Sequence, residues 1–156
     1  MAKFTGNNRL IASQQAMTTS FKSLATVSAA TATLRRAWIN DVIFSTDAAP
    51  TDNACVCDIS RITALGTASA AVLTLPDSAD TAVGTVLQVN STVEPTVTAV
   101  SSLLSYGFNA RATYRWFPSS PGQELVIPAV NVNGLAFRLL SQGYTGTGMV
   151  SLGGYE

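Results

Sequence analysis

The side chains that most often carry catalysis are sparse in this chain. Its 156 residues include no histidine, the commonest general base and metal ligand, so a Ser–His–Asp or Cys–His nucleophile is excluded. Of the carboxylates, Asp77 and Asp80 share one loop-like segment, while Asp47, Asp52 and Asp58 surround another. Paired carboxylates can hydrolyse glycosides, but acids in such segments are more typical of turns. The sequence predicts a protein that is not an enzyme.

The two cysteines are the next candidates for chemistry. Cys55 and Cys57 are two positions apart in a strand-like run, so their side chains share one face. A disulfide between such near neighbours would be badly strained. A zinc site would need two more ligands, for which only Asp52, Asp58 or distant carboxylates are available. We therefore expect two buried thiols that pack as small apolar side chains, and no metal site.

One glycine-rich segment, Gly143-Tyr-Thr-Gly-Thr-Gly148, invites comparison with nucleotide-binding loops. It lacks the lysine and the following helix of a phosphate-binding loop, and its glycine spacing differs from that of a dinucleotide-binding turn. The segment is typical of a hairpin turn, and the sequence predicts no cofactor.

Aromatic and arginine side chains gather between residues 106 and 117. The alternation there is the clearest in the chain, with Tyr114 and Trp116 on one face and Arg111 and Arg115 on the other. We interpret the two aromatic residues as sandwich core and the two arginines as interface candidates. In the alternative reading, an exposed aromatic cluster stacks sugar rings or anchors a protein partner. The cluster also contains Tyr106, Phe108 and Phe117.

Composition favours one domain that works in contact with other proteins. A chain of 156 residues has room for one ordinary domain, and 47% hydrophobic residues suffice for a core. Only 12% of the residues are charged, and the net charge is zero. Such a surface gives little repulsion between neighbouring molecules, which favours a subunit whose surface is covered. No apolar run approaches the ~20 residues of a membrane span, so we expect no membrane contact.

Charge is unevenly distributed along the chain. The first 40 residues contain basic residues and no acid, whereas acids outnumber bases in the remainder. We interpret the first region as a basic segment that docks on an acidic protein, because its charges are too sparse for a nucleic-acid patch. It contains no hydrophobic run of a secretion signal, so the sequence predicts a cytoplasmic origin. The basic residues of this region are Lys3, Arg9, Lys22, Arg35 and Arg36.

The remaining pattern predicts an all-β fold. Residues 1–31 are rich in Ser, Thr, Ala and Gln; a short helix from Met17 is weighed against the threonines there, and we predict an extended N-terminal arm. Residues 32–156 form one domain of about eight short strands separated by turns, which favours a jelly-roll-like β-sandwich. The expected strands are 34–45, 54–63, 72–75, 84–89, two halves of 103–117 about Gly107, 124–127, 135–140 and 148–152.

The C-terminal part of the chain resembles a known family. The residues that carry the likeness are Arg61-Ile-Thr-Ala-Leu-Gly-Thr67, Glu94-Pro-Thr96, Phe108-Asn-Ala-Arg-Ala-Thr-Tyr-Arg-Trp-Phe117, Pro121-Gly-Gln-Glu-Leu-Val-Ile-Pro128, Asn133-Gly134, Tyr144-Thr-Gly146 and Glu156. Their order is similar to that in small virion structural proteins of tailed bacteriophages. The similarity covers residues 33–156 and rests on turns and strands rather than on catalytic motifs.

The resemblance implies a non-enzymatic capsid decoration, or cement, protein. Such a protein would bind the assembled head shell from outside, as a trimer in contact with the major capsid protein, after assembly in the host cytoplasm. It would bind neither nucleic acid nor membrane directly. The expected capsid or subunit contacts are Lys3, Arg9, Arg35, Arg36, Arg111 and Arg115. The alternatives are a tail, adaptor or fibre-base component and, from a different class, a module that binds host carbohydrate.

Overall fold

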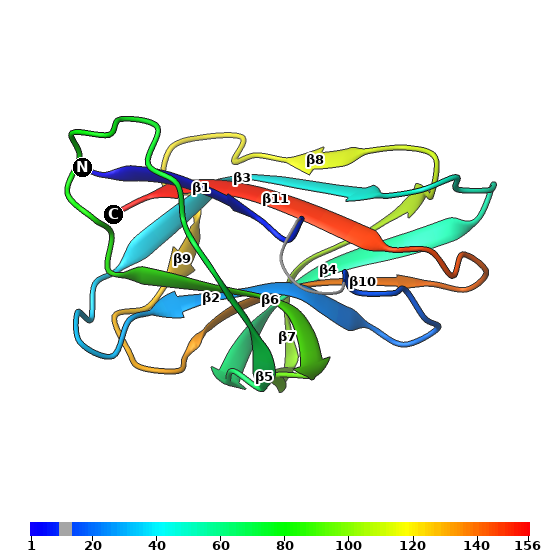
Figure 1. Cartoon of the computed structure of the whole chain (residues 1–156), viewed down its shortest axis with the longest axis horizontal. Coiled ribbons are helices and arrows are strands. Elements are labelled where there is room, and N and C mark those ends of the chain that lie inside the picture. The colour runs from blue at the N-terminus through cyan, green and yellow to red at the C-terminus, as the bar shows by residue number, and fades with distance from the viewer. Residues whose placement is uncertain (10–13) are drawn as a thin grey trace.

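Alternating apolar residues become the inner faces of two antiparallel sheets in a computed structural model of the chain (Figure 1). The structure describes residues 1–9 and 14–156, and this part of the chain contains eleven strands and no helix. It therefore has no helix that could cross a membrane. The all-β class is confirmed, and the two sheets pack as a β-sandwich.

The first sheet has five strands. Its centre is formed by β11 (Gly148–Tyr155) and β3 (Ala37–Thr46), which pair antiparallel along their lengths. On the far side of β11 lies β1 (Lys3–Asn7). On the far side of β3, β8 (Tyr114–Trp116) and β9 (Leu125–Ile127) pair with different parts of the strand.

The second sheet has six strands, and the main core lies between it and the first. In spatial order these strands are β5 (Thr67–Ala71), β6 (Thr85–Val93), β2 (Lys22–Ala29), β10 (Gly134–Ser141), β4 (Ala54–Ala64) and β7 (Thr96–Asn109). Side chains from both sheets fill the interior, and the largest fully buried ones include Phe4, Phe44, Phe137, Ile39, Ile59 and Leu135. Burial of such side chains supplies about 1.5–3 kcal/mol each, which makes this layer the main source of stability.

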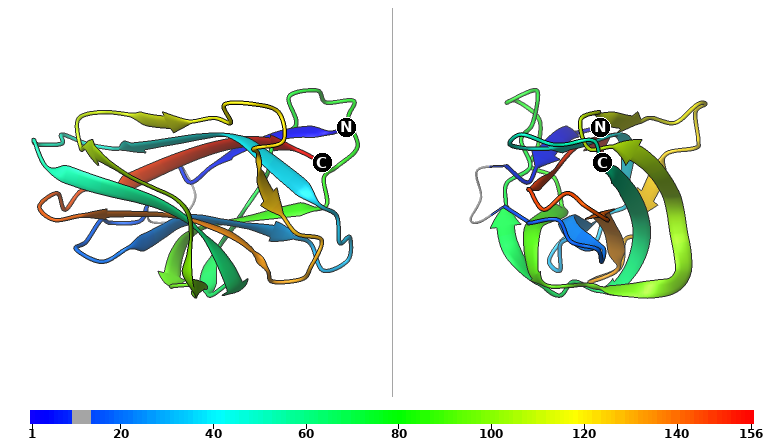
Figure 2. Two further views of the ribbon diagram at one scale, coloured as in Figure 1. Left: turned by 180° about the vertical axis from the view of Figure 1, so that it is seen from behind. Right: turned by 90° about the vertical axis from the view of Figure 1, so that its right-hand side faces the viewer.

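A sharp bend divides the second sheet. Only residues 65–66 separate β4 from β5, and only residues 94–95 separate β6 from β7, although each linked pair spans the sheet. The four strands therefore form one long two-stranded ribbon that folds at these links. Thr67 pairs with Val93 on one side of the fold, and Ala64 pairs with Thr96 on the other. Figure 2 shows β4 and β7 curving together along one side of the sandwich.

The bend is accompanied by a second, polar buried layer on the side of β10 and β4 that faces away from the main core. Asp58 and Ser60 of β4 are both buried. The Arg138 guanidinium of β10 donates to the Asp58 carboxylate at 2.7 Å and stacks on the ring of Phe21, 4.7 Å from its centroid. The hydroxyl of Ser102 on β7 donates to the other Asp58 oxygen at 2.6 Å. This network ties β7 to the middle of the sheet.

The structure differs from the predicted N-terminal arm of residues 1–31. Within the described part of that segment, β1 pairs with β11 and β2 lies between β6 and β10. Residues 23–29 are buried on both faces of β2, so the strand shows no alternation of apolar and polar residues. Small Ser, Thr and Ala side chains suit a strand that is packed on both sides, and the same composition suggested an arm. The helix weighed for this segment is absent from the described residues.

Other strand limits also differ from the prediction. The break expected at Gly107 lies at residues 110–113 instead, because β7 continues to Asn109. Residues 72–75 were expected to form a strand, but β5 ends at Ala71 and only Thr74 forms a bridge, with Thr5. The strands β3, β4, β6, β9, β10 and β11 lie where the pattern predicts them, with shifted ends.

Candidate functional site

The predicted cationic contacts do not form one site. Lys3 on β1 and Arg9 just after it are exposed, as is Arg36. Arg35 lies 3.8 Å from the carboxylate of Glu156. The four residues are spread over the start of the chain and the approach to β3, so the basic segment is not a continuous patch.

Both arginines of the aromatic segment are paired with acids. Arg111 follows β7 and lies 3.4 Å from the Asp52 carboxylate. Arg115 on β8 forms a two-pronged contact with Asp41 of β3, with donor–acceptor distances of 2.8 and 2.9 Å. Hydrogen bonding to that carboxylate, and its charge, raise the pKa of Arg115 above its usual value. The side chains of both arginines are exposed on the surface, as the alternation predicts.

The cysteines are the buried thiols that the sequence predicts. Cys55 and Cys57 are both free and fully buried on β4. Burial raises the pKa of both thiols, and that of Cys57 reaches about 11. The Cys57 thiol donates a weak hydrogen bond to the carbonyl of Tyr106 on β7. Within residues 1–9 and 14–156, no cluster of three or more His, Cys, Asp or Glu side chains is arranged to hold a metal ion.

The aromatic segment divides into two parts. Tyr114 and Trp116 are half-buried and pack against the main core, as interpreted from the sequence. The Tyr114 ring stacks on that of Tyr106 with centroids 4.4 Å apart, which joins β8 to β7 across the side of the sandwich. Tyr106 itself is about half exposed, whereas Phe117 lies apart and is 64% exposed.

Strand β7 is an open edge of unusual composition. Its sequence, Thr96 to Asn109, contains no charged residue and no proline. In the part of the chain that the structure describes, β4 is its only strand partner. Exposed edge strands are normally blunted by charge, proline or a covering segment, because their free backbone groups pair with other chains. The protection that β7 does have comes from three register shifts against β4, the widest where Ser60 pairs with Ser102 but Ile62 pairs with Val97.

Apolar side chains project from this edge. Val100 sits in the bulge with φ of 51° and is fully exposed, an unusual conformation for a β-branched residue. Leu103 and Tyr106 are also exposed farther along the strand. We call β7 with these three side chains the β7 edge. It offers both unpaired backbone groups and apolar contact area.

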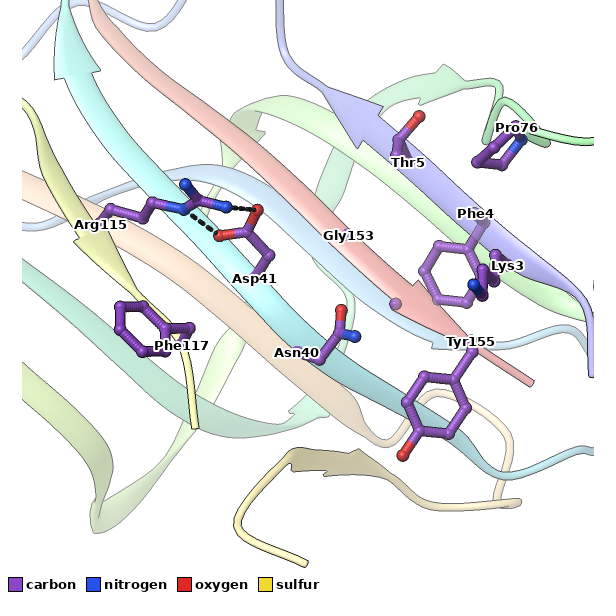
Figure 3. Close-up of a pocket in the computed structure, with 11 residues that line it drawn as sticks. Lys3, Phe4, Thr5, Asn40, Asp41, Pro76, Arg115, Phe117, Gly153 and Tyr155 are labelled. Carbon is purple, nitrogen blue, oxygen red and sulfur yellow. Dashed lines mark hydrogen bonds and ion pairs between the residues drawn. The ribbon is translucent and has the colours of Figure 1, made fainter. Parts of the chain in front are cut away.

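A groove of about 380 Å³ opens on the outer face of the first sheet (Figure 3). It brings together two predicted contacts that are far apart in the sequence, Lys3 and Arg115. Its floor is β11 at Gly153, and its sides include Asn40 and the Asp41–Arg115 pair. We call this the β11 groove.

A bulge in β3 shapes the groove. Gly153 pairs with Asp41 and Gly154 with Ile39, so Asn40 is an extra residue opposite β11. Asn40 is exposed and Asp41 partly so, whereas Ile39 and Val42 on either side are buried. The bulge therefore places two adjacent polar side chains on the outer face, where strict alternation allows only one.

Aromatic rings lie at two margins of the groove. The Tyr155 ring stacks on Trp38 with centroids 5.5 Å apart. Desolvation, and the nearby carboxylate of Glu124, raise the pKa of the Tyr155 hydroxyl. Phe117, just after β8, projects at another margin (Figure 3).

Sequence reasoning missed the groove, although one signal was present. Two consecutive polar residues, Asn40 and Asp41, interrupt the apolar alternation of a strand, which indicates a bulge. The other components come from β1, β8 and β11, and only the sheet register brings them together.

Comparison with known proteins adds no relative: no family model, curated protein or solved structure matches this chain.

Proposed function

We propose that this protein is a non-enzymatic structural subunit of a bacteriophage virion, a capsid decoration protein that binds and stabilises the assembled head shell. The observation that carries the proposal is the β7 edge, which is long, uncharged and unpaired among the described residues. The resemblance of residues 33–156 to virion structural proteins supplies the biological setting. The sandwich would then be jelly-roll-like, as in that family.

The physical reasoning begins with the free subunit. A free molecule that exposes such an uncharged edge is prone to pair with other chains, and the zero net charge of the protein does not oppose this. In a subunit that functions within a lattice, a neighbouring subunit covers that edge. A strand of the major capsid protein could extend the second sheet beyond β7, with Val100 and Leu103 packing into its surface.

Stabilisation of the shell follows from linkage. A ligand that binds only the assembled shell shifts the equilibrium toward that state. Repeated contacts on a symmetric lattice add to this effect through effective concentration, and a trimer would multiply them at three-fold positions. The protein would therefore sit on the capsid exterior after assembly in the host cytoplasm.

The basic start of the chain supports a second contact with the shell. The side chains of Lys3, Arg9 and Arg36 have no acidic partner among the described residues. They are exposed and would attract an acidic neighbouring subunit, mainly by speeding association. Arg35, Arg111 and Arg115 are already paired with acids and contribute less.

The copy number per virion tests this proposal. Quantitative mass spectrometry of purified virions, with the major capsid protein as internal reference, should give on the order of hundreds of copies, because lattice symmetry repeats the position. A count of roughly three to twelve would instead indicate a tail, adaptor or fibre-base component. Absence from purified virions would overturn the proposal altogether.

A further inference from the structure

The β11 groove contains a glycine that the fold does not require. A Cβ at Gly154 would lie 2.3 Å from the carbonyl oxygen of Trp38 and 2.8 Å from the Phe4 ring, so packing demands glycine there. At Gly153 the nearest atom, Cβ of Asp41, would lie 3.6 Å away, which is ordinary contact. Glycine inside a strand weakens it and often marks a bulge, such as the one opposite Gly153, or a close approach by a ligand. The bare floor at Gly153 leaves room for an occupant of the groove.

The polar side chains beside this floor retain unused hydrogen-bonding capacity. No side-chain hydrogen bond or ion pair joins Asn40 or Lys3 to another described residue. Arg115 uses two of its five N–H groups on Asp41, whose oxygens can each accept a further bond. Unused donors and acceptors therefore lie on both sides of the floor, with Lys3 on β1 and Asn40, Asp41 and Arg115 on the side of β3 and β8.

We propose that the β11 groove binds a saccharide, a function beyond the proposed structural role. A sugar ring has a C–H face that packs on the electron-rich faces of aromatic rings, here Tyr155 and Phe117. Its hydroxyl rim both donates and accepts, which matches Asn40 and the ionic pair of Asp41 and Arg115. The volume of about 380 Å³ lies at the lower end of the ~300–1,000 Å³ range of small-ligand sites.

Two other ligand classes fit the groove less well. A phosphorylated ligand would find one unpaired cation, Lys3, because Arg115 is neutralised by Asp41. A peptide strand would find no free backbone to pair with at the floor, since Gly153 is already paired with Thr5 on one side and Asp41 on the other.

The test begins with the full-length protein. It is applied to a printed array of hexose, hexuronate and N-acetylhexosamine oligosaccharides, and the best-bound oligosaccharide is then titrated in solution by calorimetry. We expect saturable binding of at least one oligosaccharide. Absence of any binding at millimolar concentrations, or preference for a nucleotide or an extended peptide, would overturn the inference.

Variants then locate the binding. Gly153→Val fills the floor and Asn40→Ala removes polar contacts; each should weaken binding by at least about ten-fold, the loss that follows from one displaced hydrogen-bonded contact. Ser151→Val is the matched control, two residues earlier on the same face of β11, and should bind within two-fold of the parent. Thermal unfolding checks that each variant is folded.

The inference fails if the two groove variants bind as tightly as the parent, or if the control loses binding equally. Neither result bears on the copy number per virion, so failure of the groove and failure of the proposed structural role remain distinguishable.

Discussion

No other described segment covers the β7 edge or the β11 groove, and the two surfaces differ in the chemical groups that they expose. The edge presents unpaired backbone with valine, leucine and tyrosine and no charge. The groove has a fully paired backbone, and its chemistry lies in polar and aromatic side chains. An unpaired backbone selects another protein chain, whereas a paired floor with polar walls selects a small hydroxyl-rich ligand. On the two proposals above, the β7 edge serves assembly and the β11 groove serves ligand recognition.

A closed edge on the opposite side of the sandwich strengthens the comparison. Strand β1 is short and carries Lys3, and its outer side is bridged by Thr74. The amide of Thr5 donates to the Thr74 carbonyl at 2.8 Å, and the Thr74 amide donates back at 2.8 Å. The chain thus caps β1 by itself and leaves β7 uncapped.

The largest expected effect comes from breaking the support of the β7 edge. Asp58→Ala leaves the Arg138 guanidinium buried without its acid, and removal of one partner from a buried pair typically costs about 3–5 kcal/mol. It also removes the acceptor of the Ser102 hydroxyl on β7. We expect a loss of that size in chemical denaturation, with amide exchange rising first in β7 and not around the groove. Asp41→Ala, which breaks the exposed pair in the groove, is the control and should cost less than about 1 kcal/mol.

Alkaline pH should destabilise the protein through a group beside the β7 edge, by less than the Asp58→Ala substitution does. The Cys57 thiol, fully buried on β4 beside β7, has its pKa raised to about 11 by burial. Because the folded state keeps its proton where the unfolded chain has lost it, the free energy of unfolding should fall between about pH 9 and 11. The expected fall is about 2–3 kcal/mol, at 1.36 kcal/mol for each unit of pKa difference.

The Cys57→Ala variant removes this titration, so its stability should fall less steeply over the same pH interval when unfolding is followed by urea titration. The comparison uses slopes, because the smaller side chain also changes absolute stability. An equal slope in both proteins would show that Cys57 does not ionise on unfolding in this range.

The smallest expected effects come from alanine substitutions at two adjacent glycines of the β11 groove. Gly153→Ala should raise stability by about 0.5–1 kcal/mol, the usual gain when glycine is replaced inside a strand. Gly154→Ala should instead lower it by about 1–3 kcal/mol, because its methyl group would overlap the Trp38 carbonyl. If the fold does not require glycine at position 153, differential scanning calorimetry should show a higher unfolding temperature for Gly153→Ala and a lower one for Gly154→Ala. A destabilised Gly153→Ala protein would remove the reason for assigning an occupant to the groove.

The sequence predicts those parts of this fold whose residues alternate. Strand β11 and the first part of β4 bury one face, so their pattern reveals them, and Cys55 and Cys57 were correctly expected to be buried. Strand β2 could not be found this way, because both its faces are buried and its Ser, Thr and Ala residues carry no period.

The candidate surfaces were less accessible to sequence reasoning than the strands. The openness of the β7 edge depends on the order of strands in the second sheet, which is set by the folds at residues 65–66 and 94–95. The groove depends on register, since it joins Lys3, Asn40, Arg115 and Gly153 from four strands. The sequence predicts Lys3 and Arg115 as contacts but cannot show that they line the same groove.

The β7 edge is tested most directly by placing charge on it. Leu103→Lys with Ser105→Lys adds two cations at exposed positions of β7, one at the register shift between Ser102 and Leu104 and one in the regularly paired part. We would measure co-sedimentation of this folded variant with head shells that lack the protein, beside the parent and a Ser151→Lys control. The account predicts that the parent and control saturate the shell, while the β7 variant binds at least about 100-fold more weakly, since an unpaired charge in an interface costs several kcal/mol. Equal binding by the β7 variant and the parent would contradict it.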